Sequence, residues 1–373
     1  MYSWLKRNLG DLYYVLPYLE VLENKNKLIF DILCHKKQFE LQLKCGVNVA
    51  LRHDQFLDMI NLLGAITYST SCNKVTHNSI ELCFDMKNKF IVDLNNLGHE
   101  DGKLLSLLFE GSRSGASFVT NSNESLGVEG KTLKISERAK KKIVETGNGL
   151  KFYLDSITPG IIVETYIRKM HVIEPSESFT NKIVVDVGGE CGDTAIYYAS
   201  RGATVYVFEP VKAHYEAMLR NISLNPDLAE KIIPTNSAIG KDGILKFYLS
   251  NRSEIAETAS FVYNTHGSDA KVVEISGYSL ESAYAKYNLQ HIDLLKMDCK
   301  GCEFFLNSES LKNVDSVKIE YLAYDESHKL EDLLKILKEN GFEFIIFRHE
   351  PFYYRSNLFC ATIYGKKSNS KSY

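Results

Sequence analysis

Several common signals are missing from this chain of 373 residues. It has no run approaching the roughly 18 uninterrupted apolar residues that indicate a membrane-spanning helix. Acidic and basic residues nearly balance, leaving a net charge of −3 at neutral pH. A concentrated basic face, which nucleic-acid binding usually needs, is therefore not indicated. These absences predict a protein with no transmembrane segment and no nucleic-acid partner.

A disulfide framework and a secretory signal are also missing. The eight cysteines are scattered along the chain, so most are expected to be small core residues. Lys6 and Arg7 precede an apolar stretch, but Asp11 and Pro17 interrupt it too early for a signal peptide. We therefore expect a soluble, cytoplasmic protein.

Length and pattern together predict two domains, because a chain of this size exceeds the usual limit of one hydrophobic core. Residues 1–150 carry mixed, weak signals and predict a smaller N-terminal α+β domain of unknown role. Residues 151–366 alternate short apolar runs with helical stretches, and residues 367–373 form a polar tail.

In the first domain the clearest patterns are short. We expect helices over Tyr2–Leu22 and Asp54–Leu63, strands over Phe39–Leu43, Ile80–Phe84 and Phe90–Val92, and a loop over Gly111–Gly130. Ser136–Val144 resembles a short helix with a basic face formed by Arg138, Lys140, Lys141 and Lys142. Such a run is most often a solvated helix face, and the alternative is a docking edge for an anionic acceptor.

The second domain predicts an α/β fold with a doubly wound parallel sheet, because its apolar runs are continuous and alternate with helices. The last two strands have no helix between them, so an antiparallel C-terminal hairpin is expected. The expected strands are Ile183–Val187, Thr204–Phe208, Lys231–Pro234, Ile292–Met297, Ser316–Leu322, Phe342–Phe347 and Leu358–Tyr364. The expected helices are Thr194–Ser200, Ala213–Leu224, Leu280–Tyr287 and Leu330–Glu339.

The strongest chemical signal follows the first of these strands. Asp186 closes the strand, a loop with Gly188, Gly189 and Gly192 follows, and Asp193 and Thr194 begin a helix. Such a loop lets backbone approach a ligand, and the next strand ends at Glu209, where a ribose diol would lie. Asp186 would repel a pyrophosphate but can orient the ammonium of an amino acid. The loop therefore favours S-adenosylmethionine over a dinucleotide, and the alternative is a glycine-rich turn that serves packing only.

The second signal is the strand Ile292–Met297 and the loop after it, Asp298-Cys299-Lys300-Gly301-Cys302-Glu303. Ligands of such sheets bind beyond the carboxyl ends of the strands. Asp298 and Glu303 should therefore face the same crevice as Gly188.

Taken together, the motifs Asp-Val-Gly-Gly-x-x-Gly-Asp-Thr, Phe-Glu-Pro and Leu-Leu-Lys-Met-Asp-x-x-Gly-x-Glu resemble the FkbM family of methyltransferases over roughly Asp155–Tyr364. The hairpin ending resembles the Rossmann-like class I methyltransferase sheet rather than the dehydrogenase version. Members typically methylate hydroxyl oxygens, often on sugars, natural products or glycolipids, so the resemblance implies a small-molecule or glycan acceptor. Many members carry an acid at the position of Lys300, and this departure leaves a catalytic role at that position in doubt.

The resemblance also implies roles for single residues. Asp186, Gly188 and Gly192 would hold the methionine part and Glu209 the ribose, while Asp298 would lie near the methyl group. The full predicted cofactor set is Asp186, Gly188, Gly189, Gly192, Asp193, Thr194, Glu209, Pro210, Asn236, Ser237, Ala238 and Asp298, of which Asn236 to Ala238 would flank the adenine.

Activation of a hydroxyl needs a base, and the candidates in order are Asp298, Glu303 and Glu320. His349 could in principle serve, although a lone histidine is more often structural. Aromatic residues at 352–354 could stack on a sugar or simply pack. No metal site is expected, because Cys299 and Cys302 have no second close pair to complete a zinc site, and a redox role for the pair stays open. Two rival functions are a non-catalytic S-adenosylmethionine-binding adaptor and a nicotinamide oxidoreductase.

Overall fold

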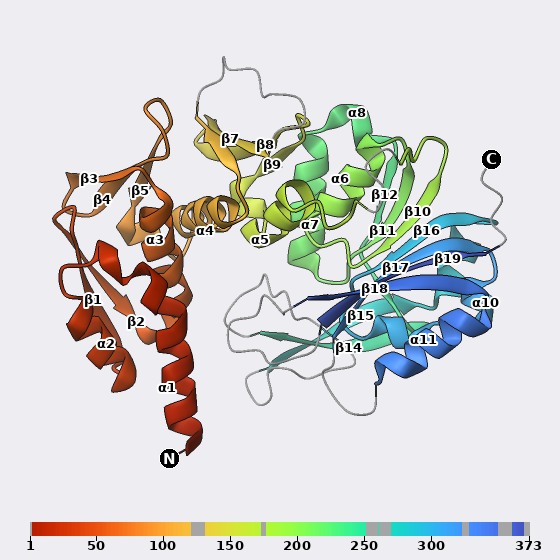
Figure 1. The fold of residues 1–373 in the computed structure, drawn as a ribbon. Coiled ribbons are helices and arrows are strands. Elements are labelled where there is room, and N and C mark those ends of the chain that lie inside the picture. The colour runs from red at the N-terminus through yellow and green to blue at the C-terminus, as the bar shows by residue number, and fades with distance from the viewer. Residues whose placement is uncertain are drawn as a thin grey trace. The chain divides into compact units, whose positions relative to one another are not determined.

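The computed structural model describes residues 2–120, 131–172, 177–250, 260, 270–322, 328–349 and 360–368. The chain divides into two compact units, Met1–Val172 and Ile173–Tyr373. Figure 1 shows the helices and strands of both units.

The first unit combines helices with small sheets, as expected for an α+β domain. Its longer helices are α1 (Tyr2–Val15), α2 (Lys25–Leu33), α3 (Phe56–Tyr68), α4 (Glu100–Arg113) and α5 (Pro159–Ile162). Short helical turns are η1 (Leu16–Val21), η2 (His53–Gln55), η3 (Leu94–Asn96), η4 (Leu154–Ser156) and η5 (Val163–Ile167). Its strands are β1 (Gln38–Leu43), β2 (Val47–Arg52), β3 (Ser71–Thr76), β4 (Ser79–Cys83), β5 (Lys89–Asp93), β6 (Ser117–Val119), β7 (Thr132–Arg138), β8 (Lys141–Thr146) and β9 (Lys151–Tyr153).

These elements extend the first unit beyond residue 150, where the sequence predicted a boundary. Strand β9 pairs with β8 in an antiparallel ladder. Helix α5 contacts α4. Residues 151–172 therefore share the core of the first unit rather than that of the second.

The helix predicted over Ser136–Val144 is wrong. Strands β7 and β8 form an antiparallel hairpin, with Arg138 opposite Lys141. Ala139 and Lys140 make the turn between them, and both have positive φ, as the tight turns of two-residue hairpins require. The basic side chains are also not a bare face, because Lys141 pairs with Asp155 and Lys142 pairs with Glu100 and Asp101.

The second unit is built on a seven-stranded sheet in the order β12-β11-β10-β16-β17-β19-β18. Its strands are β10 (Ile183–Val187), β11 (Thr204–Phe208), β12 (Ile232–Thr235), β16 (Ile292–Met297), β17 (Val314–Leu322), β18 (Phe342–His349) and β19 (Cys360–Lys367). The first five run parallel, and β19 pairs antiparallel with both β17 and β18. The predicted doubly wound Rossmann-like sheet with an antiparallel C-terminal hairpin is confirmed.

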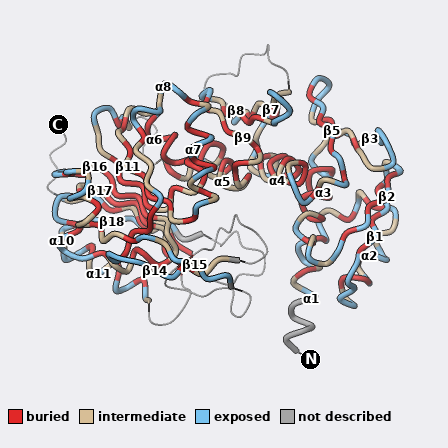
Figure 2. Tube along the Cα trace, turned by 180° about the vertical axis from the view of Figure 1, so that it is seen from behind, coloured by how far each residue is buried: buried red, intermediate tan, exposed pale blue. Residues whose placement is uncertain are grey.

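Helices cover both faces of this sheet. They are α6 (Asp193–Ser200), α7 (Lys212–Ser223), α8 (Pro226–Ala229), α9 (Leu280–Lys286), α10 (Ser308–Leu311) and α11 (Leu330–Glu339), with the turn η7 (Cys302–Phe305). Val185 and Val187 of β10 share a core with residues of α9 and α11, whereas α6 contacts β10 and β11. Because alternate residues of a strand point to opposite faces, the middle strands are buried along most of their length (Figure 2).

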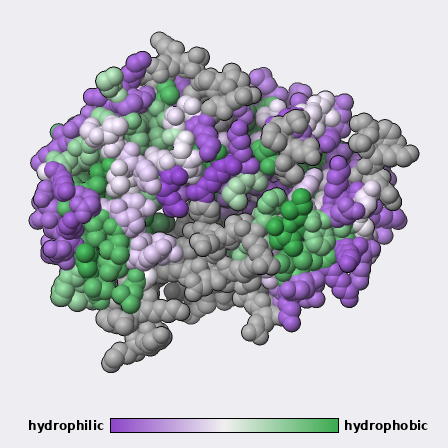
Figure 3. Space-filling view, in the orientation of Figure 1, coloured by the Kyte–Doolittle hydropathy of each residue, from purple (hydrophilic) through white to green (hydrophobic). Residues whose placement is uncertain are grey.

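A second, smaller sheet in this unit was not predicted. Strands β13 (Ala238–Ile239), β14 (Gly243–Ser250) and β15 (Ala270–Tyr278) form it in the order β13-β15-β14. Among the described residues no helix is long and apolar enough to cross a membrane. Apolar surface lies near the edge strand β18 (Figure 3), where Ile345 and Phe347 are exposed.

Candidate functional site

The predicted site residues converge at the carboxyl ends of the parallel strands. Hydrogen bonds join neighbouring strand ends: Gly188 N donates to Phe208 O (3.0 Å) and Asp298 N donates to Val187 O (2.9 Å). A third such bond joins the ends of β11 and β12, where Glu209 N donates to Thr235 O (3.0 Å). Loops from four strands therefore form one edge, which is where ligands of such sheets bind.

The glycines of the first loop are required by close contacts within the protein. Gly188 has φ +83°, and a Cβ there would lie 2.0 Å from the carbonyl oxygen of Asp298. Gly192 has φ +84°, and its Cβ would lie 2.8 Å from Met218 on α7. The loop thus packs against the end of β16 on one side and against α7 on the other. This packing places the backbone of the loop at the carboxyl ends of the parallel strands.

Asp186, the acid before the loop, is fully buried and already paired. Its Oδ1 lies 2.9 Å from Nζ of Lys296 on β16, and its Oδ2 accepts a hydrogen bond from Thr194 Oγ1 (2.6 Å). Burial opposes the charge of Lys296, but the combined attraction of Asp186, Asp298 and Asp193 outweighs burial and raises the lysine pKa. Lys296 also donates to Gly188 O (3.1 Å), so one buried ion pair ties both ends of the loop to the sheet. Direct contact of Asp186 with a ligand stays a prediction.

Lys296 was missed as a functional residue. A lysine within the short run Leu294–Met297, where its neighbours are apolar, is the signal that could have identified it, since a buried cation needs a buried partner.

Glu209, at the end of β11, is buried and fixed in place. Its carboxylate accepts hydrogen bonds from the backbone N–H groups of Glu190 and Val211, each 2.8 Å long. Nδ1 of the buried His214 lies 3.5 Å from Oε1 of Glu209. Asn236 donates from its side chain to the Glu209 carbonyl (2.8 Å), which holds the end of β12 beside the end of β11.

The remaining predicted cofactor residues line the same edge. Ser237 is buried, and its hydroxyl has no hydrogen-bond partner among the described residues. A buried hydroxyl without a partner is unfavourable unless a ligand supplies one. Ala238 begins β13 beside it, and Pro210 follows Glu209.

Three charged side chains form a cluster where β16 and β17 end. Nζ of Lys300 lies 2.6 Å from Oδ1 of Asp298 and also forms an ion pair with Oε2 of Glu320. Burial opposes ionisation of Asp298, but Lys300 and then Lys296 outweigh it and lower the pKa of that carboxyl. Burial and the neighbouring Asp298 charge raise the pKa of Glu320 to about 8. The two acids, first and third on the predicted list, therefore lie together, and Asp298 ionises at a lower pH than Glu320.

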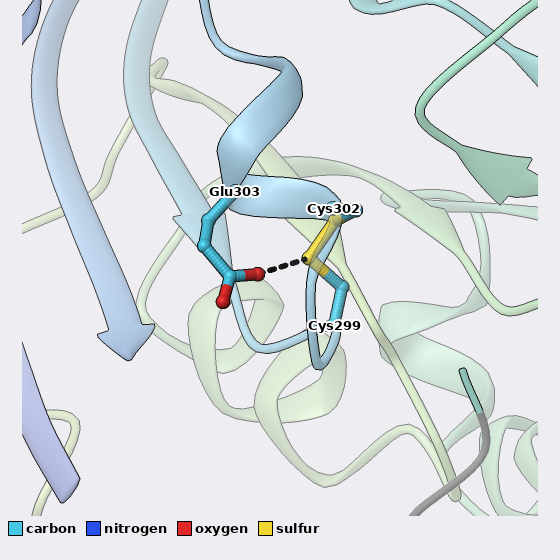
Figure 4. A group of neighbouring side chains, drawn as sticks. All are labelled: Cys299, Cys302 and Glu303. Carbon is cyan, nitrogen blue, oxygen red and sulfur yellow. Dashed lines mark hydrogen bonds between the residues drawn. A yellow bond between two sulfur atoms is a disulfide. The ribbon is translucent and has the colours of Figure 1, made fainter. Parts of the chain in front are cut away.

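Glu303, the second candidate acid, faces the loop instead. It is 1% exposed, and its Oε2 accepts a hydrogen bond from Gly301 N (2.7 Å). Burial raises its pKa to about 7. Cys299 and Cys302 form a disulfide beside it, with Sγ of Cys299 3.6 Å from Oε2 (Figure 4). Glu303 thus stabilises the turn that carries Lys300.

Two other candidates cannot be placed. The side chain of His349 and the aromatic residues at 352–354 lie outside the part of the chain whose side chains the structure describes.

This sheet order, the glycine loop and the acid after β11 define a class I methyltransferase that uses S-adenosylmethionine. Residues 186–344 match the model of the methyltransferase FkbM domain. The match lies within the second unit and confirms the FkbM resemblance of the sequence motifs.

Three solved structures illustrate the similarity in fold. One is magnesium protoporphyrin IX methyltransferase from Synechocystis PCC 6803 with bound cofactor, with 12% identity, coverage of 51% of this chain and 72% of that chain, and a TM-score of 0.31. Another is TYW2 from M. jannaschii with bound cofactor, with 17% identity, coverage of 63% and 85%, and a TM-score of 0.34. The third is a methyltransferase FkbM from Methylobacillus flagellatus KT, with 15% identity, coverage of 54% and 47%, and a TM-score of 0.34. The comparison with curated proteins gave no match.

Proposed function

We propose that this methyltransferase methylates a hydroxyl oxygen of a small molecule or a glycan. The observation that carries the proposal is the pair Asp298 and Glu320, whose carboxyls meet at the strand ends. Their side chains are 32% and 21% exposed, so both are partly accessible from solvent. An alcohol is a poor nucleophile until its proton is removed, and a positioned carboxylate typically accelerates such a step about 10²- to 10⁴-fold.

For the cofactor we propose the following placement. The carboxylate of Glu209 binds the ribose diol, because its two backbone hydrogen bonds leave lone pairs on both oxygens. The backbone of residues 188–192 holds the methionine part. Asn236, Ser237 and Ala238 flank the adenine, and the buried Ser237 hydroxyl gains the partner that it lacks among the described residues.

The bound cofactor supplies an electrophilic methyl group, and the chain supplies orientation and a proton acceptor. When bound, the cofactor would give its methyl group to the acceptor oxygen and leave as S-adenosylhomocysteine, and a carboxylate of the chain would take the hydroxyl proton. We assign the proton to Glu320, because a base works best when its pKa lies near the working pH. Asp298, whose pKa is lowered, stays ionised and accepts a hydrogen bond from the acceptor.

The test uses S-adenosylmethionine labelled in its methyl group and fractionated extract of the source cells. We expect label in a small-molecule or glycan fraction, in a form that survives mild alkali as an ether does and an ester does not. Glu320→Gln should lose about 10²-fold or more in rate while it still binds the cofactor in calorimetry. In the wild type the rate should rise with pH through about 8, as Glu320 loses its proton.

Alkali-labile or nitrogen-bound label would contradict a hydroxyl acceptor. Cofactor binding with no labelled product in any fraction would instead favour the non-catalytic adaptor. Glu343→Gln is the matched control, because Glu343 is an exposed acid on β18.

A further inference from the structure

Lys300 lies in the loop after β16, next to Gly301. Its ammonium lies between two carboxylates from neighbouring strands, Asp298 after β16 and Glu320 in β17. At 12% exposure its side chain is more buried than either acid. Lys300 is therefore part of the interior of the site rather than a surface charge.

The backbone holds Lys300 in an unusual conformation. Its φ is +53°, a left-handed value that is unfavourable for a residue with a Cβ, and Gly301 follows with φ +121°. The hydroxyl of the buried Ser260 donates to the Lys300 carbonyl (2.7 Å), and Gly301 N donates to Glu303 (2.7 Å). Strained residues held by several contacts often serve function.

The pair of acids at this point needs a positive charge. Two carboxyls this close repel when both are ionised, and proteins often relieve such pairs with a divalent cation bound through carboxylate oxygens. Here the ammonium of Lys300 already contacts one oxygen of each acid. A divalent cation placed between the same oxygens would overlap with it and meet its charge.

We propose that Lys300 is a built-in cation that takes the place of a divalent metal ion between Asp298 and Glu320, so that methyl transfer in this protein needs no metal. The proposal rests on the proposed function only in taking these acids as the acceptor side of the site. It also gives Lys300 a role: it holds Asp298 and Glu320 in one arrangement and supplies positive charge beside the reacting oxygen.

The experiment measures Mn²⁺ binding by electron paramagnetic resonance, in which bound Mn²⁺ leaves the sharp signal of the free ion. It needs neither cofactor nor acceptor, so a failure of the proposed function leaves its result intact. Wild type and Asp298→Asn should bind the same amount of Mn²⁺. Lys300→Met should gain about one equivalent, on the 10⁻⁴ to 10⁻³ M scale of weak oxygen-ligand sites, and Lys300→Met with Glu320→Gln should lose it.

Two controls make the comparison decisive. Lys300→Arg keeps a cation and should gain no Mn²⁺. The exposed group His291, Asp293 and Asp315, which could bind some Mn²⁺, is the same in every variant and cancels in the difference.

Mn²⁺ in wild type that Asp298→Asn loses would overturn the proposal. So would a Lys300→Met protein that keeps its circular dichroism and cofactor binding but gains no Mn²⁺. If Lys300→Met does not fold, the comparison of wild type with Asp298→Asn decides alone.

Discussion

The buried ion pair of Lys296 and Asp186 gives the sharpest stability prediction. Lys296→Met removes the cation but keeps most of the side-chain volume, and it leaves the Asp186 carboxylate charged and without its partner in the sheet. The side chains are 4% and 0% exposed, so water cannot replace the lost partner. Breaking a buried pair from one side typically costs about 3–5 kcal/mol.

A double variant separates loss of pairing from loss of packing. Lys296→Met with Asp186→Asn removes both charges, and the Asn oxygen can still accept the hydrogen bond from Thr194. We expect this double variant to recover most of the stability, because neutral replacements of buried pairs are often close to neutral in effect. Lys335→Met is the control, since the exposed pair of Lys335 and Glu339 on α11 should contribute at most about 0.5 kcal/mol.

The assay is hydrogen exchange followed by mass spectrometry on peptides that contain β10 and β16. These peptides report directly on the two strands that the ion pair joins. In Lys296→Met the exchange of these peptides should speed up by about 10²- to 10⁴-fold, since each 1.4 kcal/mol is a factor of ten. A Lys296→Met protein within about 1 kcal/mol of wild type, or a double variant less stable than the single, would refute the reasoning.

Two further predictions concern the loops. The raised pKa of Glu303, about 7, means that the folded state prefers the protonated acid, so stability is full below the unfolded pKa near 4.5 and falls as pH rises towards 7. Urea unfolding should show a loss between pH 4.5 and 7 that is larger in wild type than in Glu303→Gln by up to about 3 kcal/mol, and equal pH profiles would contradict it. Gly188→Ala, with φ +83° and 2.0 Å from Asp298 O, should weaken S-adenosylmethionine binding at least about tenfold in calorimetry. Gly149→Ala is the matched control, since φ is +79° there with no atom within 4 Å, and unchanged affinity in Gly188→Ala would count against a rigid loop.

The fold of the second unit could be predicted because its central strands are buried on both faces. Three strands are observed at the predicted residues: Ile183–Val187, Thr204–Phe208 and Ile292–Met297. Short, largely apolar runs of this kind are typical of strands buried on both faces. The second, smaller sheet was missed because β14 and β15 mix polar with apolar residues, and side chains such as Ile244 and Val272 are exposed. For strands of mixed composition such as these, pairing with neighbouring strands matters more than composition.

The positions of the site acids could be predicted from the sequence, but their pKa shifts could not. Strand-end location placed Asp298 and Glu320 correctly at one edge, because parallel strands end together. The choice among the acids depended on partners far away in sequence, such as Lys300 beside Glu320. The N-terminal error at residues 136–144 has the same origin, because only the pairing of β7 with β8 reveals that Ala139 and Lys140 form a turn.

A crystal structure of the full chain with S-adenosylhomocysteine tests the central claim most directly. We predict that both ribose hydroxyls lie within hydrogen-bond distance of the Glu209 carboxylate and that the amino-acid part lies along the backbone of residues 188–192. We also predict that the Ser237 hydroxyl contacts the ligand. A nucleoside bound elsewhere, or one that leaves Glu209 without contact, would contradict the account.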